Sequence, residues 1–291
     1  MNPTEPQDDV STDWWDHRPA FSVSDKGSRI TGLVPGRPAW HPAPHLLGAA
    51  LLCFAVWAAV ALLGSSVLCG GTSGECLTDV GQGWLIGGVV VLGYLALLAT
   101  VGLAERARER FGQRRAASLF YLTPLLAGIA VGSGAGVALA LGPSWSEGAR
   151  RALDGVPGTE AVLVSAVVTV LAAVWGLVVA AQLPAALRHA RQRQETIERL
   201  RRDGHRYAGT VRLGEVSFWL HNDPELDVTV TYDSPAGRHE VAARMRSSTE
   251  RVPKDGSKVI VLTDLRGAVH VELDPDVEHV FEPEERYSPS E

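Results

Sequence analysis

Four long runs without a single charged residue limit what this chain can fold into. They cover residues 46–68, 84–103, 119–142 and 161–183, and each is 20 to 24 residues long. A helix rises about 1.5 Å per residue, so about 20 apolar residues cross the roughly 30 Å hydrocarbon core of a bilayer. Buried helices of a soluble bundle would instead carry polar residues along an outer face. The runs therefore predict a domain of four transmembrane helices at residues 46–183, in contact with the lipid bilayer.

The arginines between these runs indicate how the helices are oriented. The second gap and the segment after the fourth run are rich in arginine, whereas the first gap has no Lys or Arg and the third has only Arg150 and Arg151. Cytoplasmic flanks of membrane helices carry an excess of basic residues, so both termini and the middle loop are predicted to be cytoplasmic. The only lysines are Lys26, Lys254 and Lys258, a usage typical of GC-rich bacterial genomes. The predicted location is therefore the plasma membrane of a bacterium.

Two cysteines lie in the gap that this orientation places outside the cell. Cys69 and Cys76 bracket the sequence CGGTSGEC, and an oxidising compartment would allow them to form a disulfide. The alternative is two free thiols, with Cys69 as the last apolar residue of its helix. Cys53 lies within the first run and is interpreted as a small buried apolar residue.

The residues inside the runs bear on transport and on helix packing. Ion and proton pathways generally place ionisable side chains within the membrane, and these four runs contain none. Gly128, Gly132 and Gly136 recur every four residues, so they share one face of the third helix. Small residues on such a face let a neighbouring helix approach closely. The stripe is therefore a predicted helix-packing surface and the predicted contact of a homo-oligomer.

Residues 184–204 predict an arginine-rich cytoplasmic helix that follows the fourth span. Its arginines either contact anionic lipid headgroups or form the topology signal and a solvated face. One face of this helix carries a seam that lasts barely two heptads, which is too short for a coiled coil. The seam consists of Leu187, Ala190, Gln194, Ile197 and Arg201.

From residue 205 the sequence takes on the period of strands. Six short runs in residues 205–275 are rich in valine and aromatic residues, and several alternate apolar with polar residues. Gly, Pro, Asn and Asp mark turns between them. They predict a small all-β domain of about six strands, a barrel or a sandwich, in which closure would protect the edge strands. The fold class is thus a multi-pass α-helical membrane protein with a small all-β domain.

The β-rich region also carries motifs that resemble a known group of proteins. In chain order they are AGTV from Ala208, VTVTYD from Val228, the turn glycine Gly237 and DGSKVIV from Asp255. They resemble an uncharacterised bacterial family, common in actinobacteria, of predicted membrane proteins with a small C-terminal β-barrel domain of unknown function. Members commonly read glycine then aspartate where this chain has Asp255 then Gly256, and the run at residues 269–273 departs from their usual Asp-Pro ending. The resemblance implies a fold and a location, and it carries no catalytic residue.

Little in the β-rich region points to catalysis or to nucleic acid. Its histidines lie on different predicted strands or at their ends, and it contains no cysteine, so metal-ligand spacings and nucleophile motifs are missing. We therefore predict no catalytic, metal-binding or cofactor-binding residue. A formal net charge of -6 gives no reason to expect a nucleic-acid partner, since a phosphate-binding module needs a clustered basic face and this region is net acidic.

Both ends of the chain are predicted to be unstructured. Residues 1–45 are polar and proline-rich without an apolar period, which is typical of a disordered cytoplasmic leader. Trp14 and Trp15 in this leader are either a docking motif for a partner or a contact with the protein's own surface. Residues 276–291 are predicted to form a mobile acidic tail.

Three hypotheses about function follow from these features. The first is a non-enzymatic scaffold or interaction protein whose cytoplasmic β-domain binds a protein partner that the sequence does not identify. The second is a small oligomeric channel or transporter built on the glycine stripe of the third span. The third is a membrane-anchored enzyme with a site on the β-domain. Charge-free spans disfavour the second hypothesis, and the missing motifs disfavour the third.

Overall fold

The computed structural model describes most of the chain, and its residues divide into two compact units. The described residues are 18–34, 44–70, 82–141, 146–147, 150, 153–154, 160–220 and 223–287. The helical unit comprises the described parts of Pro42–Arg108 and Ala116–Ala186. The β unit comprises those of Met1–His41, Glu109–Arg115 and Leu187–Glu291. Each unit is therefore built from segments that lie far apart in the sequence.

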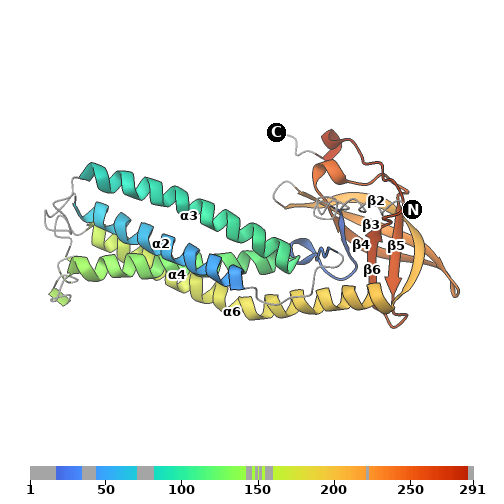
Figure 1. Ribbon diagram of the computed structural model, residues 1–291, viewed down its shortest axis with the longest axis horizontal. Helices are drawn as coiled ribbons and strands as arrows, with labels where there is room; N and C mark the ends of the chain where they lie inside the picture. Colours follow the sequence, from blue (N-terminus) through green and yellow to red (C-terminus); the bar gives the residue numbers. More distant parts are fainter. Residues whose placement is uncertain are drawn as a thin grey trace, which may run out of the picture. The chain divides into compact units, whose positions relative to one another are not determined.

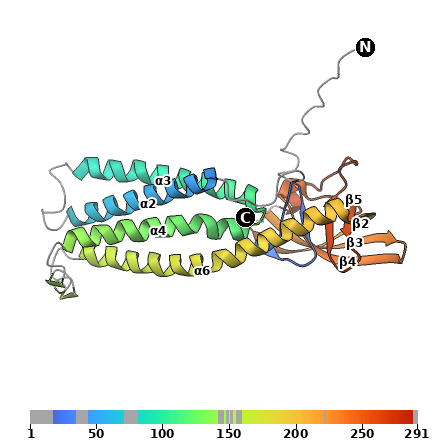
Figure 2. The same cartoon turned by 60° about the horizontal axis from the view of Figure 1, so that its bottom comes forward.

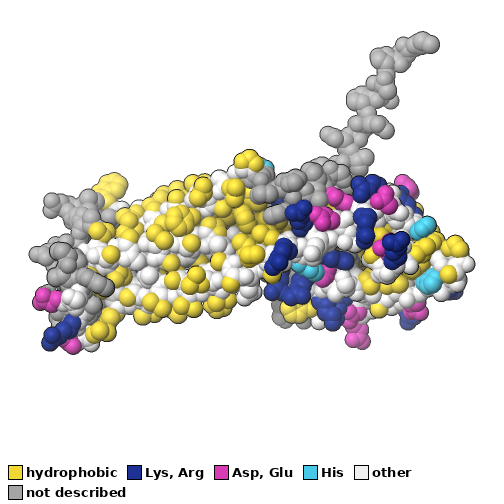
Figure 3. All heavy atoms as spheres, turned by 90° about the horizontal axis from the view of Figure 1, so that it is seen from below, with side chains coloured by type: hydrophobic (Ala, Val, Ile, Leu, Met, Phe, Trp, Pro, Cys, Tyr) yellow, Lys and Arg dark blue, Asp and Glu magenta, His cyan; other side chains and the backbone are white. Residues whose placement is uncertain are grey.

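Within the described residues, four helices are long and apolar enough to cross a membrane, which confirms the predicted fold class. They are α2 (Pro44–Gly70), α3 (Gln82–Phe111), α4 (Arg114–Leu141) and α6 (Glu160–Asp203). In the helical unit the four lie side by side (Figures 1 and 2). Figure 3 shows hydrophobic side chains along their outer surface, where exposed valines and leucines suit a lipid environment.

The strands form one antiparallel sheet that is nearly closed into a barrel. They are β1 (Ala20–Ser22), β2 (His205–Leu220), β3 (Asp223–Ser234), β4 (Gly237–Arg246), β5 (Lys258–Thr263) and β6 (Val269–Leu273), in the sheet order β1-β4-β3-β2-β5-β6. The two end strands of this order, β1 and β6, lie in contact. Their contact brings the edges of the sheet together, as the predicted closure requires.

The number of strands agrees with the prediction, but the strands differ from those predicted. The first two predicted runs form the single strand β2, which has register shifts against β3 between Leu213 and Val216 and between Val216 and Phe218. Such irregularities bend a strand without ending it. The sixth strand is β1, which comes from the leader that was predicted to be disordered, and it pairs with β4. Three residues are too few to show a strand period in the sequence, so only the free edge of β4 defines this strand.

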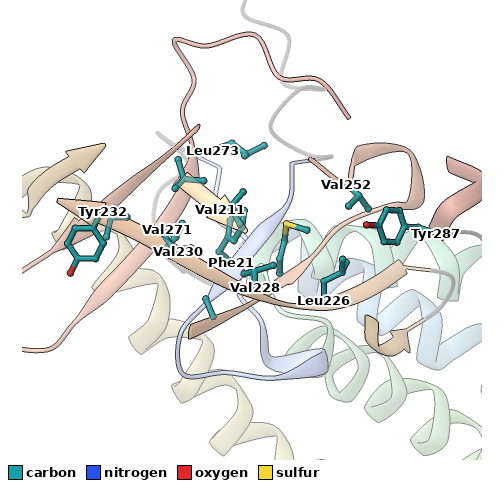
Figure 4. Close-up of a cluster of buried hydrophobic side chains, with 14 residues drawn as sticks. Phe21, Val211, Leu226, Val228, Val230, Tyr232, Val252, Val271, Leu273 and Tyr287 are labelled. Carbon is teal, nitrogen blue, oxygen red and sulfur yellow. The ribbon is translucent and has the colours of Figure 1, made fainter. Parts of the chain in front are cut away.

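A hydrophobic core fills the inside of the barrel (Figure 4). Alternate residues of the long strands, such as Val228 and Val230 on β3, point into it, as expected for strands with one buried face. Phe21 of β1 and Tyr287 of η3 (Glu284–Tyr287) belong to the same core. Residues 276–287 therefore pack against the barrel, in contrast to the predicted mobile tail, because Tyr287 brings an aromatic ring into the core.

Candidate functional site

The candidate site lies within the β unit, where three segments meet the barrel. These are the leader segment (residues 18–34, including β1 and η1, Gly27–Arg29), the α3–α4 connection (Glu109–Arg115), and the part of α6 that begins at Leu187. We call their shared contact the anchoring site. It consists mostly of polar groups that are buried or half-buried.

Asp25 links the leader segment to α6. Its backbone N–H donates a hydrogen bond to the Ser22 hydroxyl (2.9 Å), which fixes the turn after β1. Its carboxylate lies 3.0 Å from His189 Nε2 and 3.0 Å from Arg193 Nε, two side chains one helical turn apart on α6. The Asp25 side chain is only 7% exposed. A carboxylate at this depth needs cationic or hydrogen-bonding partners, so α6 and the leader segment stabilise each other.

The α3–α4 connection contacts the leader segment through a close approach of two glycines. Gly112 has a φ of +61°, a left-handed conformation that ends α3 and favours glycine. Its carbonyl accepts a hydrogen bond from Gly32 N (2.9 Å), and a Cβ atom on Gly112 would collide with the carbonyl of Gly32. Beside it, the buried amide of Gln113 donates to the hydroxyl of Thr31 (2.7 Å).

The short seam predicted on α6 faces this site instead of a second helix. Gln194 is buried and donates a hydrogen bond to the Arg110 carbonyl (3.1 Å). Arg201, one further seam residue, donates from Nη2 to the Leu33 carbonyl (2.6 Å) and from Nε to Glu272 Oε1 of β6 (2.7 Å). The seam therefore ties α6 to the leader segment, the α3–α4 connection and the barrel at once.

Glu272, which is half-buried, is the second carboxylate of the anchoring site. Besides Arg201, its Oε1 contacts His270 Nε2 at 2.7 Å. Burial raises the pKa of Glu272, but the hydrogen bond and charge of His270, together with Arg201, outweigh it and lower the pKa to about 2. Arg18 of the leader segment is linked to the same charges. Burial lowers its pKa to about 10, a shift opposed by Glu272 and increased by Arg201.

A further ion pair holds the hairpin between β2 and β3. Arg114, the first residue of α4, pairs with Asp223, the first residue of β3. Nearby, the buried Glu225 pairs with Arg244 of β4 (3.0 Å). The acids of β3 closest to the turn are thus matched with arginines, which places this hairpin against the α3–α4 connection.

The glycine stripe of the third predicted span faces another helix of the same chain. Cβ atoms on Gly128, Gly132 and Gly136 would collide with Phe54, Ala58 and Ser65 of α2, respectively. A homo-oligomer formed through this stripe would therefore have to displace α2. The predicted disulfide between Cys69 and Cys76 lies outside the described residues, since these include neither Cys76 nor the side chain of Cys69. Cys53 is buried in α2 as a free thiol.

Small polar side chains within the helical unit bond to one another or to backbone. Trp57 Nε1 donates to Thr100 Oγ1 (2.9 Å), and the Thr100 hydroxyl donates to the Ala96 carbonyl (2.8 Å). The hydroxyls of Ser133 and Thr169 lie 2.8 Å apart and link α4 to α6. Pairing of this kind is what a helix bundle in lipid requires of its polar groups.

The barrel histidines serve mainly structural contacts. Tyr207, Tyr232 and His239 stack across neighbouring strands with ring centroids 5.7 and 5.2 Å apart, which stabilises the sheet. His239 also lies 2.8 Å from the Ser234 hydroxyl. That hydroxyl contacts Ala236 N and the Gly237 carbonyl as well, so it shapes the β3–β4 turn. His221 lies outside the described residues.

Neither a search for metal-ligand clusters nor a comparison with known proteins identifies a further functional residue. Within the described ranges no group of three or more His, Cys, Asp or Glu side chains is arranged to hold a metal ion. The chain matches no protein-family model, no curated protein and no solved structure. The resemblance to an actinobacterial membrane-protein family therefore stays a sequence-based prediction.

Sequence reasoning missed most residues of the anchoring site. Asp25, Gly32 and Gly112 lie in segments without a motif. Bonded residues of this site are up to 168 residues apart in the sequence, as in the bond between Arg201 and Leu33. The one available signal was the α6 seam, where the buried Gln194 and the half-buried Arg201 are unusual on an apolar face. A polar pair at seam positions predicts a polar partner, and the structure shows that the partner is not another helix.

Proposed function

We propose that this chain is a non-enzymatic scaffold of the bacterial plasma membrane, with both termini in the cytoplasm. In this proposal the barrel binds a protein partner close to the membrane surface. The arginine distribution supports the orientation. The observation that carries the proposal is the anchoring site, because a domain held by Asp25, Arg201 and Glu272 keeps its surface in a fixed position relative to the arginine-rich part of α6.

This proposal explains why the barrel is built from both ends of the chain. A flexible tether would suffice to keep an enzyme near a membrane. Here the leader segment adds β1 to the sheet, while the turn of the α3–α4 connection bonds to Gly32. Each attachment restricts the movement of the barrel, and restricted movement reduces the entropy lost when a partner binds.

The alternative functions make different demands on the molecule. A channel or transporter needs a polar path, yet the four runs are free of charges, and hydroxyls such as those of Thr100 and Thr169 are used in bonds between helices. An enzyme needs converging reactive groups. Among the described residues, Ser234 and His239 form a pair of this kind, but the Ser234 hydroxyl is also bonded to the backbone of the β3–β4 turn.

The test compares two variants of the complete chain in its own membrane. Asp25→Ala removes the carboxylate of the leader segment that holds His189 and Arg193 of α6. Glu195→Ala removes an exposed carboxylate on α6 itself, which pairs with Arg191. We expect both variants to insert into the membrane. Proteins that co-purify with the unmodified chain should be retained by Glu195→Ala and lost or depleted with Asp25→Ala, as measured by quantitative mass spectrometry.

A flux assay completes the test. Proteoliposomes containing the purified chain should release entrapped ions and small solutes no faster than empty liposomes. Solute flux above this background would overturn the scaffold proposal in favour of a channel. Identical sets of co-purifying proteins for the two variants would contradict the proposed role of the anchored barrel.

A further inference from the structure

The β2–β3 hairpin exposes two adjacent aromatic side chains close to its turn. Phe218 is 53% exposed and Trp219 is 37% exposed, although most large apolar residues of the barrel strands point into the core. Both follow the register shifts of β2, and they pair with Glu225 and Pro224 of β3. Because adjacent residues of a strand point to opposite faces, the aromatic surface covers both sides of the hairpin end.

The ion pair between Arg114 and Asp223 fixes the location of this hairpin. Arg114 is the first residue of α4, and the apolar run of that helix begins five residues later, at Leu119. Five helical residues span about 7 Å. The headgroup layer on each side of a bilayer is roughly 5–7 Å thick. Arg114 therefore lies at headgroup depth, and its partner Asp223 is held at about the same level.

The aromatic pair lies next to that level. Trp219 is paired with Pro224, the neighbour of Asp223 in the chain, and paired strands are about 5 Å apart. The two nearest acids do not oppose contact with lipid, since Asp223 is paired with Arg114 and Glu225 is buried against Arg244. Glu215 is exposed further along β2, which limits the contact to the headgroup region.

We propose that the end of the β2–β3 hairpin is a lipid-binding element that inserts Phe218 and Trp219 into the interface of the bilayer crossed by α4. Trp and Phe combine a large apolar surface with preferences for the water–lipid boundary, and Trp in particular is enriched there. Arg110 and Arg115 of the α3–α4 connection add positive charge that favours anionic headgroups around this element. The element depends on α4 crossing the membrane and is independent of any protein partner of the barrel.

Spin labels on the full-length chain in lipid nanodiscs test this element. The background is Cys53→Ala, Cys69→Ser and Cys76→Ser, and the labelled positions are Trp219→Cys and, separately, Phe218→Cys. The nanodiscs contain phosphatidylcholine and phosphatidylglycerol. The matched control is Val280→Cys, at an apolar residue of the segment 276–287 that is 60% exposed and distant in sequence from the hairpin. Collisions with oxygen, which is concentrated in lipid, are compared with collisions with a water-soluble nickel chelate.

We expect labels at residues 218 and 219 to shift toward oxygen and away from nickel, and the label at residue 280 to be open to nickel. The same labels in detergent-free amphipol, which provides no bilayer, should lose this shift. If the hairpin labels are as accessible to nickel as the control, the proposal is wrong. Protection from both reagents would show burial against protein and would also overturn it. The use of two positions guards against failure of one variant to fold.

Discussion

At the residue scale, Gly112 is the position where the backbone itself requires one amino acid. Its left-handed conformation and its contact with the Gly32 carbonyl leave no space for a side chain. We expect Gly112→Ala to lower the free energy of unfolding by about 2 kcal/mol or more, because a left-handed alanine alone costs roughly 1–2 kcal/mol. The measurement is thermal unfolding of the purified protein in detergent.

Gly102→Ala is the matched control for this change. Gly102 lies on α3 with open space around its Cα atom, and alanine favours a helix over glycine by up to about 1 kcal/mol. Its melting temperature should stay the same or rise. Equal melting temperatures for the two variants would contradict the close approach between Gly112 and Gly32.

Glu272 makes the stability of the protein depend on pH in the acid range. Its folded-state pKa of about 2 lies below the ordinary value of 4.5, so the ionised carboxylate stabilises the folded protein at every pH above about 4.5. This contribution is lost as the pH falls from 4.5 to about 2. A shift of this size corresponds to about 3 kcal/mol at most.

We expect Glu272→Gln to be less stable than the unmodified protein at pH 7 and to lose less stability between pH 4.5 and pH 2. Thermal unfolding at a series of pH values measures both differences. An unchanged pH profile would show that Glu272 is not held by His270 and Arg201. Glu215→Gln, at an exposed position on β2, provides the control with a carboxylate outside the anchoring site.

At the element scale, β1 covers the edge of β4 and contributes Phe21 to the core. Phe21→Ala should lower the free energy of unfolding by about 3–5 kcal/mol, as is usual when a buried aromatic ring is removed. Amide hydrogens of β4 should then exchange faster, because its edge loses a partner strand. Val23→Ala, at a half-exposed neighbour, should change neither the stability nor the exchange rates.

The contact of α4 with α2 leads to a prediction that separates packing within the chain from packing between copies. Leucine at Gly132 would collide with Ala58, so we expect Gly132→Leu to lower the melting temperature without changing the number of subunits measured by light scattering. Gly93→Leu, at an open position on α3, is the control. If Gly132→Leu reduced the number of subunits at an unchanged melting temperature, the stripe would be a contact between copies.

At the scale of the whole molecule, the proposed orientation can be tested with thiols. In whole cells treated with reductant, a membrane-impermeant maleimide should label Cys69 or Cys76. A cysteine introduced as Val280→Cys in a chain lacking the three native cysteines should be labelled only after the cells are permeabilised. The opposite pattern would mean that the chain crosses the membrane with its termini outside.

The sequence by itself determined the four helices and most of the strands of the barrel. Charge-free runs of 20 to 24 residues and alternating runs such as residues 226–232 are local patterns. The period of a local pattern reflects the environment of each residue along the helix or strand. The same reasoning identified the α6 seam and the glycine stripe. The sequence did not identify what packs against the seam and the stripe. A helix face with a regular pattern indicates that another segment packs on it, but the pattern does not identify that segment.

Only the tertiary structure decided which segments meet. β1 is a strand because β4 offers an unpaired edge, and Asp25 is a buried carboxylate because α6 places His189 and Arg193 beside it. Likewise, Arg114 and Asp223 come together across 109 positions of the chain. Interactions between distant residues leave no period in either segment, so the anchoring site and the exposed hairpin end became visible only in the folded protein.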